Sequence, residues 1–330
     1  MRDILLAALS GSTSAGYYWD EALAERIDNP LCLEKYGYKV YSQNDEDGIL
    51  AEIFNRIGTA SKRFIEFGVE DGTESNSHLL LHKGWKGLWL EGDKDSYQSI
   101  QQKFRLLIEN QQLQVVNSYV TKENVNDLFE ANGFKGEIDL LSIDIDGNDY
   151  HVLEAVTIVN PRVIAIEYNG KFPPDVSWTM AYNQFYRWNE TDCHGASLKA
   201  LTDLCMEKGY QLAGTNMMGV NAFFVRKDLA LNNLFITPAA AENLYNPLRL
   251  WMSYRNGHPS KTCLAVQKDG IEGMFAQLPK SQIFFSLSGF HNAEYDSNGN
   301  FSIQWMSAKQ ALLFVRTDDR QTEPIIPQSA

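Results

Sequence analysis

The stretch Phe64-Ile-Glu-Phe-Gly-Val-Glu-Asp-Gly72 decides the fold of this 330-residue chain. Its first five residues form an apolar run of strand length, and its glycines permit a tight turn in which a ligand approaches the backbone closely. A helix is predicted directly after the turn, over 72–83. A strand, a glycine turn and a helix in this order open the nucleotide-binding units of parallel α/β sheets.

The charge of this turn indicates which nucleotide it binds. A diphosphate would meet the carboxylates of Glu66, Glu70 and Asp71 and be repelled. The same carboxylates attract the sulfonium and ammonium groups of S-adenosylmethionine. We therefore predict an S-adenosylmethionine site in which Gly68 and Gly72 bring the backbone close to the cofactor.

Strand-like and helix-like segments alternate along the chain from residue 63, which is typical of a parallel sheet wound with helices. The sequence therefore predicts a Rossmann-like, doubly wound α/β fold, closed by an antiparallel hairpin. The expected strands are 64–68, 87–91, 113–117, 138–144 and 163–167, with the hairpin at 210–214 and 221–226, and the expected helices are 72–83, 97–109, 124–131, 149–156 and 197–208.

Composition excludes several classes of function. The chain has 29 Lys and Arg against 42 Asp and Glu, a net charge of −13, which disfavours nucleic acid and anionic membranes as partners. No apolar run is long enough to span a membrane, about 18 residues. The four cysteines are scattered without a CxxC pair, which predicts a cytoplasmic protein without structural zinc or disulfides.

Two polar residues end the second and third predicted strands. Glu91 stands about 20 residues after the glycine turn, the spacing at which an acid accepts hydrogen bonds from both ribose hydroxyls of a nucleotide. Asn117 ends the following strand. Both are predicted to line the cofactor site.

A cluster of oxygen ligands is expected further along the same edge of the sheet. Asp144 and Asp146 follow the fourth strand, and Glu167 and Asn169 follow the fifth. Carboxylates gathered in this way need a hard cation such as Mg²⁺, a cationic ligand, or raised pKa values. These four residues are the predicted metal ligands.

Two histidines are candidates for the base that takes a proton from the acceptor. His151 lies in the helix after Asp144, and His194 lies in a loop before the helix at 197–208. A purely structural role is the alternative for His151. The stretch between them is rich in aromatic residues, which suit either a lid over an acceptor pocket or a loop packed on the sheet.

Four motifs together resemble the FkbM-like family of class I S-adenosylmethionine-dependent methyltransferases, over about residues 41–228. They are Glu66-Phe-Gly-x3-Gly72, Leu90-Glu91, Asp139-Leu-Leu-Ser-Ile-Asp-Ile-Asp-Gly147 and Ile164-Ala-Ile-Glu167. The resemblance implies a mostly parallel seven-stranded sheet. It also implies O-methylation of a hydroxyl in a sugar, glycan or natural product.

The resemblance assigns roles to individual residues. Glu66 and Gly68 would contact the cofactor, Glu91 would bind its ribose, and Asp144 would act where sheet and substrate meet. Some related sugar O-methyltransferases hold Mg²⁺ with acids at the ends of the fourth and fifth strands, which match Asp144 and Glu167. Asn169 stands where those relatives carry a further acid.

The predicted organisation has four parts. A helical or irregular lead-in (1–40) precedes the S-adenosylmethionine-binding methyltransferase domain (41–230). A helical or irregular connection (231–280) then leads to a small β-rich appendage with a frayed tail (281–330).

Other functions remain open from the sequence. Asp144-Ile-Asp146 also matches the DxD pattern with which glycosyltransferases hold a metal and a nucleotide sugar. A non-catalytic Rossmann-like binding module is a further alternative. A dehydrogenase ranks last, because the turn lacks GxGxxG and carries the wrong charge.

Overall fold

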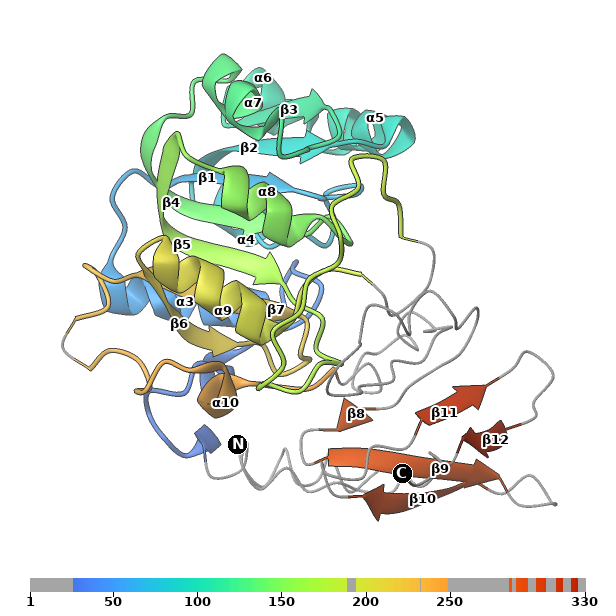
Figure 1. The fold of residues 1–330 in the computed structure, drawn as a ribbon. Coiled ribbons are helices and arrows are strands. Elements are labelled where there is room, and N and C mark those ends of the chain that lie inside the picture. The colour runs from blue at the N-terminus through green and yellow to red at the C-terminus, as the bar shows by residue number, and fades with distance from the viewer. Residues whose placement is uncertain are drawn as a thin grey trace.

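A seven-stranded sheet forms the centre of the chain (Figure 1). The structure, a computed structural model, describes residues 26–188, 194–231 and 233–248, and the backbone of five short strands between 285 and 325. The sheet order is β3-β2-β1-β4-β5-β7-β6. Its strands are β1 Arg63–Phe67, β2 Lys86–Glu91, β3 Leu113–Asn117, β4 Gly136–Ile143, β5 Val159–Glu167, β6 Tyr210–Thr215 and β7 Asn221–Arg226.

The strand directions confirm the predicted Rossmann-like fold. Strands β1 to β5 pair in parallel, whereas β7 is antiparallel to both β5 and β6. The strand order reverses between β1 and β4, and open α/β sheets bind ligands at such a reversal, beyond the carboxyl ends of the strands.

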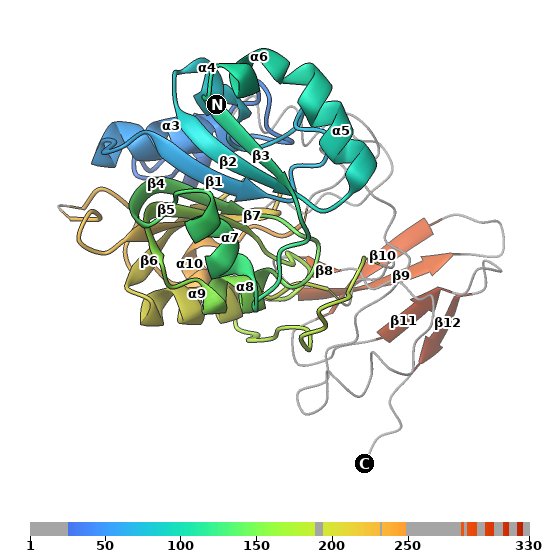
Figure 2. The same cartoon turned by 90° about the horizontal axis from the view of Figure 1, so that it is seen from above.

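Helices cover both faces of the sheet (Figure 2). On one face lie α3 Glu46–Ile57, α4 His78–His82, α5 Lys94–Lys103 and α6 Arg105–Glu109. On the other lie α7 Val125–Ala131, α8 Asp149–Ala155, α9 Leu198–Glu207 and the short α10 Ala241–Leu244. A single 3-10 turn, η1, spans Glu34–Tyr36.

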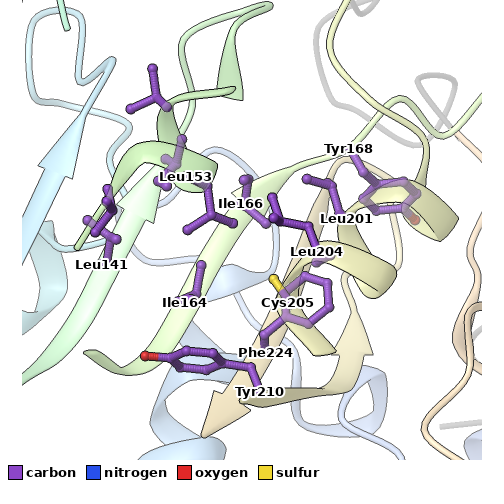
Figure 3. Close-up of a cluster of buried hydrophobic side chains, with 14 of the residues drawn as sticks. Leu141, Leu153, Ile164, Ile166, Tyr168, Leu201, Leu204, Cys205, Tyr210 and Phe224 are labelled. Carbon is purple, nitrogen blue, oxygen red and sulfur yellow. The ribbon is translucent and has the colours of Figure 1, made fainter. Parts of the chain in front are cut away.

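Each strand divides its side chains between two apolar cores, because successive residues point to opposite faces. In β1, Phe64 belongs to the core under α3, whereas Ile65 and Phe67 belong to the core under α7–α9. Figure 3 shows the second core, where Ile164 and Ile166 of β5 lie near the α9 side chains. Complete burial of such a side chain contributes roughly 1.5–3 kcal/mol to folding.

Two predicted helices differ in their bounds. The helix expected over 72–83 begins only at His78, because the carboxylate of Glu66 accepts the N–H groups of Asn76 and Ser77 and holds this stretch as a loop. The helix expected over 97–109 begins at Lys94, where Asp93 caps it, and is interrupted at Phe104.

The C-terminal strands form two small sheets. One has the order β10-β9-β8 and the other pairs β11 with β12. Their bounds are β8 Phe285–Ser286, β9 Gly289–Tyr295, β10 Phe301–Met306, β11 Leu313–Arg316 and β12 Thr322–Ile325. Strand β12 lies where the sequence predicts a frayed tail. The start of the lead-in and most of the connection fall outside the described residues, so the four-part division stays a prediction.

Within the residues described, we find no helix with the length and apolar character needed to cross a lipid bilayer.

Candidate functional site

At the carboxyl edge of the parallel sheet, one residue from each of six adjacent strands lies at the same level. Glu91 of β2 lies opposite Asn117 of β3. Phe67 of β1 pairs with Leu90 of β2 on one side and with Ile143 of β4 on the other. The residues that follow these three, Gly68, Glu91 and Asp144, are therefore level with one another. Ile143 of β4 pairs with Ile166 of β5, so Glu167, the next residue of β5, is level with them as well. Glu167 in turn lies opposite Asn221, the first residue of β7. In sheet order this edge row is Asn117, Glu91, Gly68, Asp144, Glu167 and Asn221.

The members of the edge row lie on one face of the sheet. Residues two apart on a strand share a face, so Gly68 and Glu66 lie on the same side as Phe64, which packs under α3. The sequence predicted five of the six positions as site residues and missed Asn221.

The glycine turn is fixed against β4 and β2. Gly68 has φ +77°, and a Cβ there would lie 1.4 Å from the carbonyl oxygen of Asp144. Gly72 has φ +79°, and a Cβ there would meet the ring of Trp89 at 2.6 Å. The N–H of Gly68 donates to the carbonyl of Leu90 at 3.2 Å. Only glycine fits at both positions because of the protein's own packing, and the predicted approach of the backbone to the cofactor stays a prediction.

Glu66 faces the inside of the turn. Its buried carboxylate accepts the N–H groups of Asn76 (2.8 Å) and Ser77 (2.9 Å) and the Ser77 hydroxyl. Burial raises the pKa of the Glu66 carboxyl. This residue therefore shapes the turn, and the predicted contact with a cofactor stays a prediction.

The charge of the turn is smaller than its sequence indicates. The carboxylate of Asp71 accepts from the ammonium of Lys103 at 2.5 Å, and this pair holds the pKa of Asp71 down, at about 2. With Glu66 directed inward, the acidity at the crevice depends more on the ends of β2, β4 and β5 than on the turn itself.

Glu91 ends β2 beside the turn. It is 8% exposed, and its Oε1 accepts the N–H of Asp93 at 2.7 Å. Burial raises the pKa of its carboxyl. The amide of Asn117 donates to the carbonyls of Glu91 (2.8 Å) and Gly92 (3.2 Å), so Asn117 fixes the end of β2.

Three of the four predicted metal ligands come together. One carboxylate oxygen from each of Asp144, Asp146 and Glu167 lies within 4.8 Å of the other two. The Oε2 of Glu167 is buried and has no hydrogen-bond partner among the described residues. Burial, with the neighbouring carboxylates next, raises the pKa values of Asp144 and Glu167 well above their usual range. Hard oxygen donors at this spacing fit a divalent cation such as Mg²⁺.

Asp149 holds the loop that carries Asp146. Its two carboxylate oxygens accept the N–H groups of Ile145 (2.9 Å) and Gly147 (2.8 Å), which flank Asp146 on either side. Asp146 itself has φ +55°, a conformation that favours glycine and that these bonds maintain. Burial raises the pKa of Asp149 to about 6.

Asn169, the fourth predicted ligand, joins two segments of backbone. Its Oδ1 accepts the N–H of Lys171 at 3.2 Å, and its Nδ2 donates to the carbonyl of His194 at 3.1 Å. Its own N–H donates to the carbonyl of Ala196 at 2.8 Å. These bonds tie the end of β5 to the loop before α9.

The two histidines differ in their surroundings. The Nε2 of His151 lies 2.8 Å from the carbonyl oxygen of Met180, so this nitrogen carries the proton and donates it. The Nδ1 of His194 is buried without a hydrogen-bond partner among the described residues. Burial, together with the nearby Lys171, lowers the pKa of His194 to about 4. His194 is therefore neutral at pH 7 and able to accept a hydrogen bond.

The aromatic stretch crosses this edge of the molecule as a strap, residues 178–188. Asn148 donates to the carbonyl of Asn183 at 2.8 Å, next to the bond between His151 and Met180. Between these two contacts, Tyr182 donates to Glu123 at 2.5 Å. The strap thus joins α8 to the loop between β3 and α7.

Packing under the strap is close. A Cβ on Gly147 would meet the ring of Tyr186 at 2.5 Å, and the guanidinium of Arg187 lies 3.6 Å from the ring centroid of Tyr119. Phe185 is 82% exposed. Phe172 and Trp178, by contrast, are buried and stack on each other. For these two aromatic residues, the structure therefore favours a packed loop over a lid.

A comparison with protein families identifies a domain in this chain. Residues 45–197 match the family model described as the methyltransferase FkbM domain. Among curated proteins, a sequence search finds no match.

Several solved methyltransferases match this chain at low identity and low TM-score. Magnesium protoporphyrin IX methyltransferase from Synechocystis PCC 6803, with bound SAH, has 11% identity and a TM-score of 0.39, over 67% of this chain and 92% of its own. The N-terminal domain of EvdMO1, also with SAH bound, has 14% identity and a TM-score of 0.36, over 64% of this chain and 97% of its own. The chain thus carries a methyltransferase FkbM domain over residues 45–197, the part that supplies strands β1 to β5 of the sheet.

Proposed function

We propose that this protein transfers the methyl group of S-adenosylmethionine to a hydroxyl group of a sugar, a glycan or a natural product. The observation that carries the proposal is the edge row, in which Glu91, Gly68 and Asp144 stand level on adjacent strands. In this proposal, Glu91 binds the ribose, the Gly68 turn contacts the cofactor, and Asp144 lies on the acceptor side, so the three groups are neighbours. They meet where the strand order reverses.

The cofactor occupies the β1–β2 side of the row in this proposal. The carboxylate of Glu91 accepts hydrogen bonds from the two ribose hydroxyls, and the Gly68 turn lets the methionine part lie against the backbone. Asn117 supports this contact by holding the end of β2. The sulfonium then faces the acids of β4 and β5, whose charge favours the cation.

The acceptor occupies the β4–β5 side, under the strap. Its hydroxyl oxygen attacks the methyl carbon in line with the carbon–sulfur bond, which breaks and leaves its electron pair on sulfur, giving S-adenosylhomocysteine. The hydroxyl proton passes to Nδ1 of His194, which is buried and has no hydrogen-bond partner among the described residues. His151 is a positioning residue in this scheme, since its Nε2 holds the strap at Met180.

A divalent cation such as Mg²⁺ is part of the proposal. Asp144, Asp146 and Glu167 would hold it, and the orphaned Oε2 of Glu167 fits that role. A bound cation would lower the pKa of the acceptor hydroxyl and so ease the loss of its proton.

The acceptor class and the location follow from composition. The excess of 42 acidic over 29 basic residues supports a small molecule or glycan over nucleic acid or a membrane surface. The four scattered cysteines support the cytoplasm as the location.

Isothermal titration with S-adenosylmethionine tests the cofactor half, and transfer of an isotope-labelled methyl group to a panel of sugars and glycans tests the acceptor half. We expect binding with one site per chain and label on a hydroxyl oxygen. Binding of a nucleotide sugar that requires Mn²⁺, with no binding of S-adenosylmethionine, would replace this proposal with the glycosyltransferase function that Asp144-Ile-Asp146 also permits.

A further inference from the structure

Asn221, at the acceptor end of the edge row, has an unusual environment for an amide. It is the first residue of β7, lies opposite Glu167 and is 2% exposed. Its Nδ2 donates to Oε1 of Glu46 at 3.1 Å. Its Oδ1 is buried and has no hydrogen-bond partner among the described residues.

The surrounding network fixes which end of this amide faces the site. Oε1 of Glu46 also accepts from Nδ2 of Asn216 at 2.8 Å, and its Oε2 accepts the N–H of Asn44 at 2.7 Å. The Oδ1 of Asn216 accepts the N–H of Asn221, so Asn216 cannot turn over and donate elsewhere. A carboxylate only accepts hydrogen bonds, and therefore Nδ2 of Asn221 must face Glu46 while Oδ1 faces away from it.

Two residues that each carry a buried oxygen without a hydrogen-bond partner among the described residues thus lie opposite each other. Residues directly opposite each other in an antiparallel pair point to the same face, with Cβ atoms about 4.5–5.5 Å apart. Asn221 and Glu167 are such a pair, and each has one buried oxygen without a partner among the described residues. Buried acceptors that lack donors are rare because they lose their hydration without replacement, so this pair indicates a ligand that supplies positive charge or protons.

We propose that Oδ1 of Asn221 is a neutral ligand of a divalent cation that Asp144, Asp146 and Glu167 also bind, and that Glu46 positions it. This inference rests on the cation that forms part of the proposed function. Amide oxygens are hard ligands that raise the coordination number without adding negative charge. That property suits a group that already contains three carboxylates. Asn169, the ligand that the sequence predicts, has its Oδ1 bonded to the Lys171 N–H instead.

The test is Mn²⁺ binding, measured from the electron paramagnetic resonance signal of free Mn²⁺ as protein is added. We expect one site per chain in the wild type. In Asn221→Ala the affinity falls by about 10-fold or more, a loss in the range seen when groups around a metal site are removed. Asn132→Ala is the matched control, because it removes the same side chain from the end of α7, outside the edge row, and its Mn²⁺ affinity stays at the wild-type value.

A second variant covers the case in which Asn221→Ala fails to fold. The shorter Asn221→Ser keeps one donor for the carboxylate of Glu46 and lacks the oxygen that faces the site. Its Mn²⁺ affinity falls as far as that of Asn221→Ala.

Equal Mn²⁺ affinity in the wild type and Asn221→Ala would overturn the inference, and so would the absence of Mn²⁺ binding at millimolar concentration. Titration of the same samples with S-adenosylmethionine separates the two proposals. Cofactor binding without Mn²⁺ binding removes the inference and the cation of the proposed function but leaves the methyl transfer, whereas failure to bind the cofactor removes the proposed function.

Discussion

The backbone of Gly68 lies directly against the carbonyl oxygen of Asp144, at a distance that leaves no room for a side chain. A Cβ on Gly68 would be 1.4 Å from that oxygen. The turn after β1 and the acidic end of β4 are therefore in direct contact, and the proposed cofactor side and the proposed acceptor side of the site meet at this point.

Gly68→Ala separates the effect of this contact from backbone strain. We expect a loss of at least 2–3 kcal/mol in the free energy of unfolding, because a positive φ costs about 1–2 kcal/mol for alanine and the clash adds to it. Gly58→Ala is the control, since Gly58 has a similar φ of +69° with open space around its Cβ position. Urea denaturation of both variants measures the difference. Equal losses would mean that the turn moves freely away from Asp144.

Glu91→Gln tests the proposed ribose contact. The substitution keeps the size of the side chain and removes its charge, and a hydrogen bond to a charged group is worth about 1.5–3 kcal/mol. We therefore expect the affinity for S-adenosylmethionine to fall by about 10- to 100-fold in isothermal titration. Glu109→Gln, on the exposed side of α6, is the control and should bind as the wild type does. Unchanged affinity in Glu91→Gln would remove this residue from the cofactor site.

Most of the edge row could be predicted from the sequence because parallel strands bring their last residues to one edge. Glu91, Asp144 and Glu167 each follow an apolar run, so their level placement needs only the sheet order. Asn221 could not be recognised in the same way. It begins its strand, and only the antiparallel direction of β7 brings that start to the same edge. Pairing the predicted hairpin with the fifth strand was the signal that could have found it.

The roles of other residues depend on contacts that no local pattern contains. The partner of His151 is a carbonyl 29 positions further along the chain, and Asp71 pairs with a lysine 32 positions away. Glu66 matches the motif of the turn, yet its carboxylate is directed at Asn76 and Ser77. Residue type predicted where these side chains lie along the sheet, and the tertiary fold decides which way they face.

His151→Ala should loosen the strap without affecting the cofactor. The loss of one hydrogen bond, about 1 kcal/mol, corresponds to roughly fivefold faster opening and hence faster proteolysis within residues 178–188. His151→Gln can still donate to the carbonyl of Met180 and is expected to restore much of the protection. Limited proteolysis followed by mass spectrometry locates the cuts, and the affinity for S-adenosylmethionine stays unchanged. If cleavage in both variants matched the wild type, His151 would not hold the strap.

Asp144→Asn should stabilise the protein while removing methyl transfer. The folded-state pKa of Asp144 is raised, so the stability linked to its protonated form is present below pH 3.8 and is lost as the pH rises through the folded pKa. At pH 8 the carboxyl is ionised in the unfolded chain, so folding must either bury its charge or take up a proton, and both oppose folding. We expect the variant to unfold at higher urea concentration, by about 1 kcal/mol, when no divalent cation is present. A less stable variant at pH 8 would show that the charge at Asp144 is compensated in the folded protein.

The protonation of His194 is expected to change stability with pH in the opposite direction to Asp144, and over a different pH range. Its pKa falls from 6.5 in the unfolded chain to about 4 in the folded protein, because burial disfavours the imidazolium and the nearby Lys171 repels it. Below pH 6.5 the unfolded chain binds the extra proton first, so stability is complete above pH 6.5 and is lost as the pH falls toward 4. The full shift corresponds to roughly 3 kcal/mol, at about 1.4 kcal/mol for each pH unit.

The measurement is the free energy of unfolding at intervals from pH 7 to 4, in the wild type and in His194→Gln. Asp149, whose raised pKa of about 6 falls within this window, contributes a term of opposite sign that is common to both proteins, so the difference between the curves isolates His194. We expect the wild type to lose more stability than the variant as the pH falls. Parallel curves would mean that His194 is solvated and takes up its proton freely, in which case it could not serve as the buried acceptor of the hydroxyl proton.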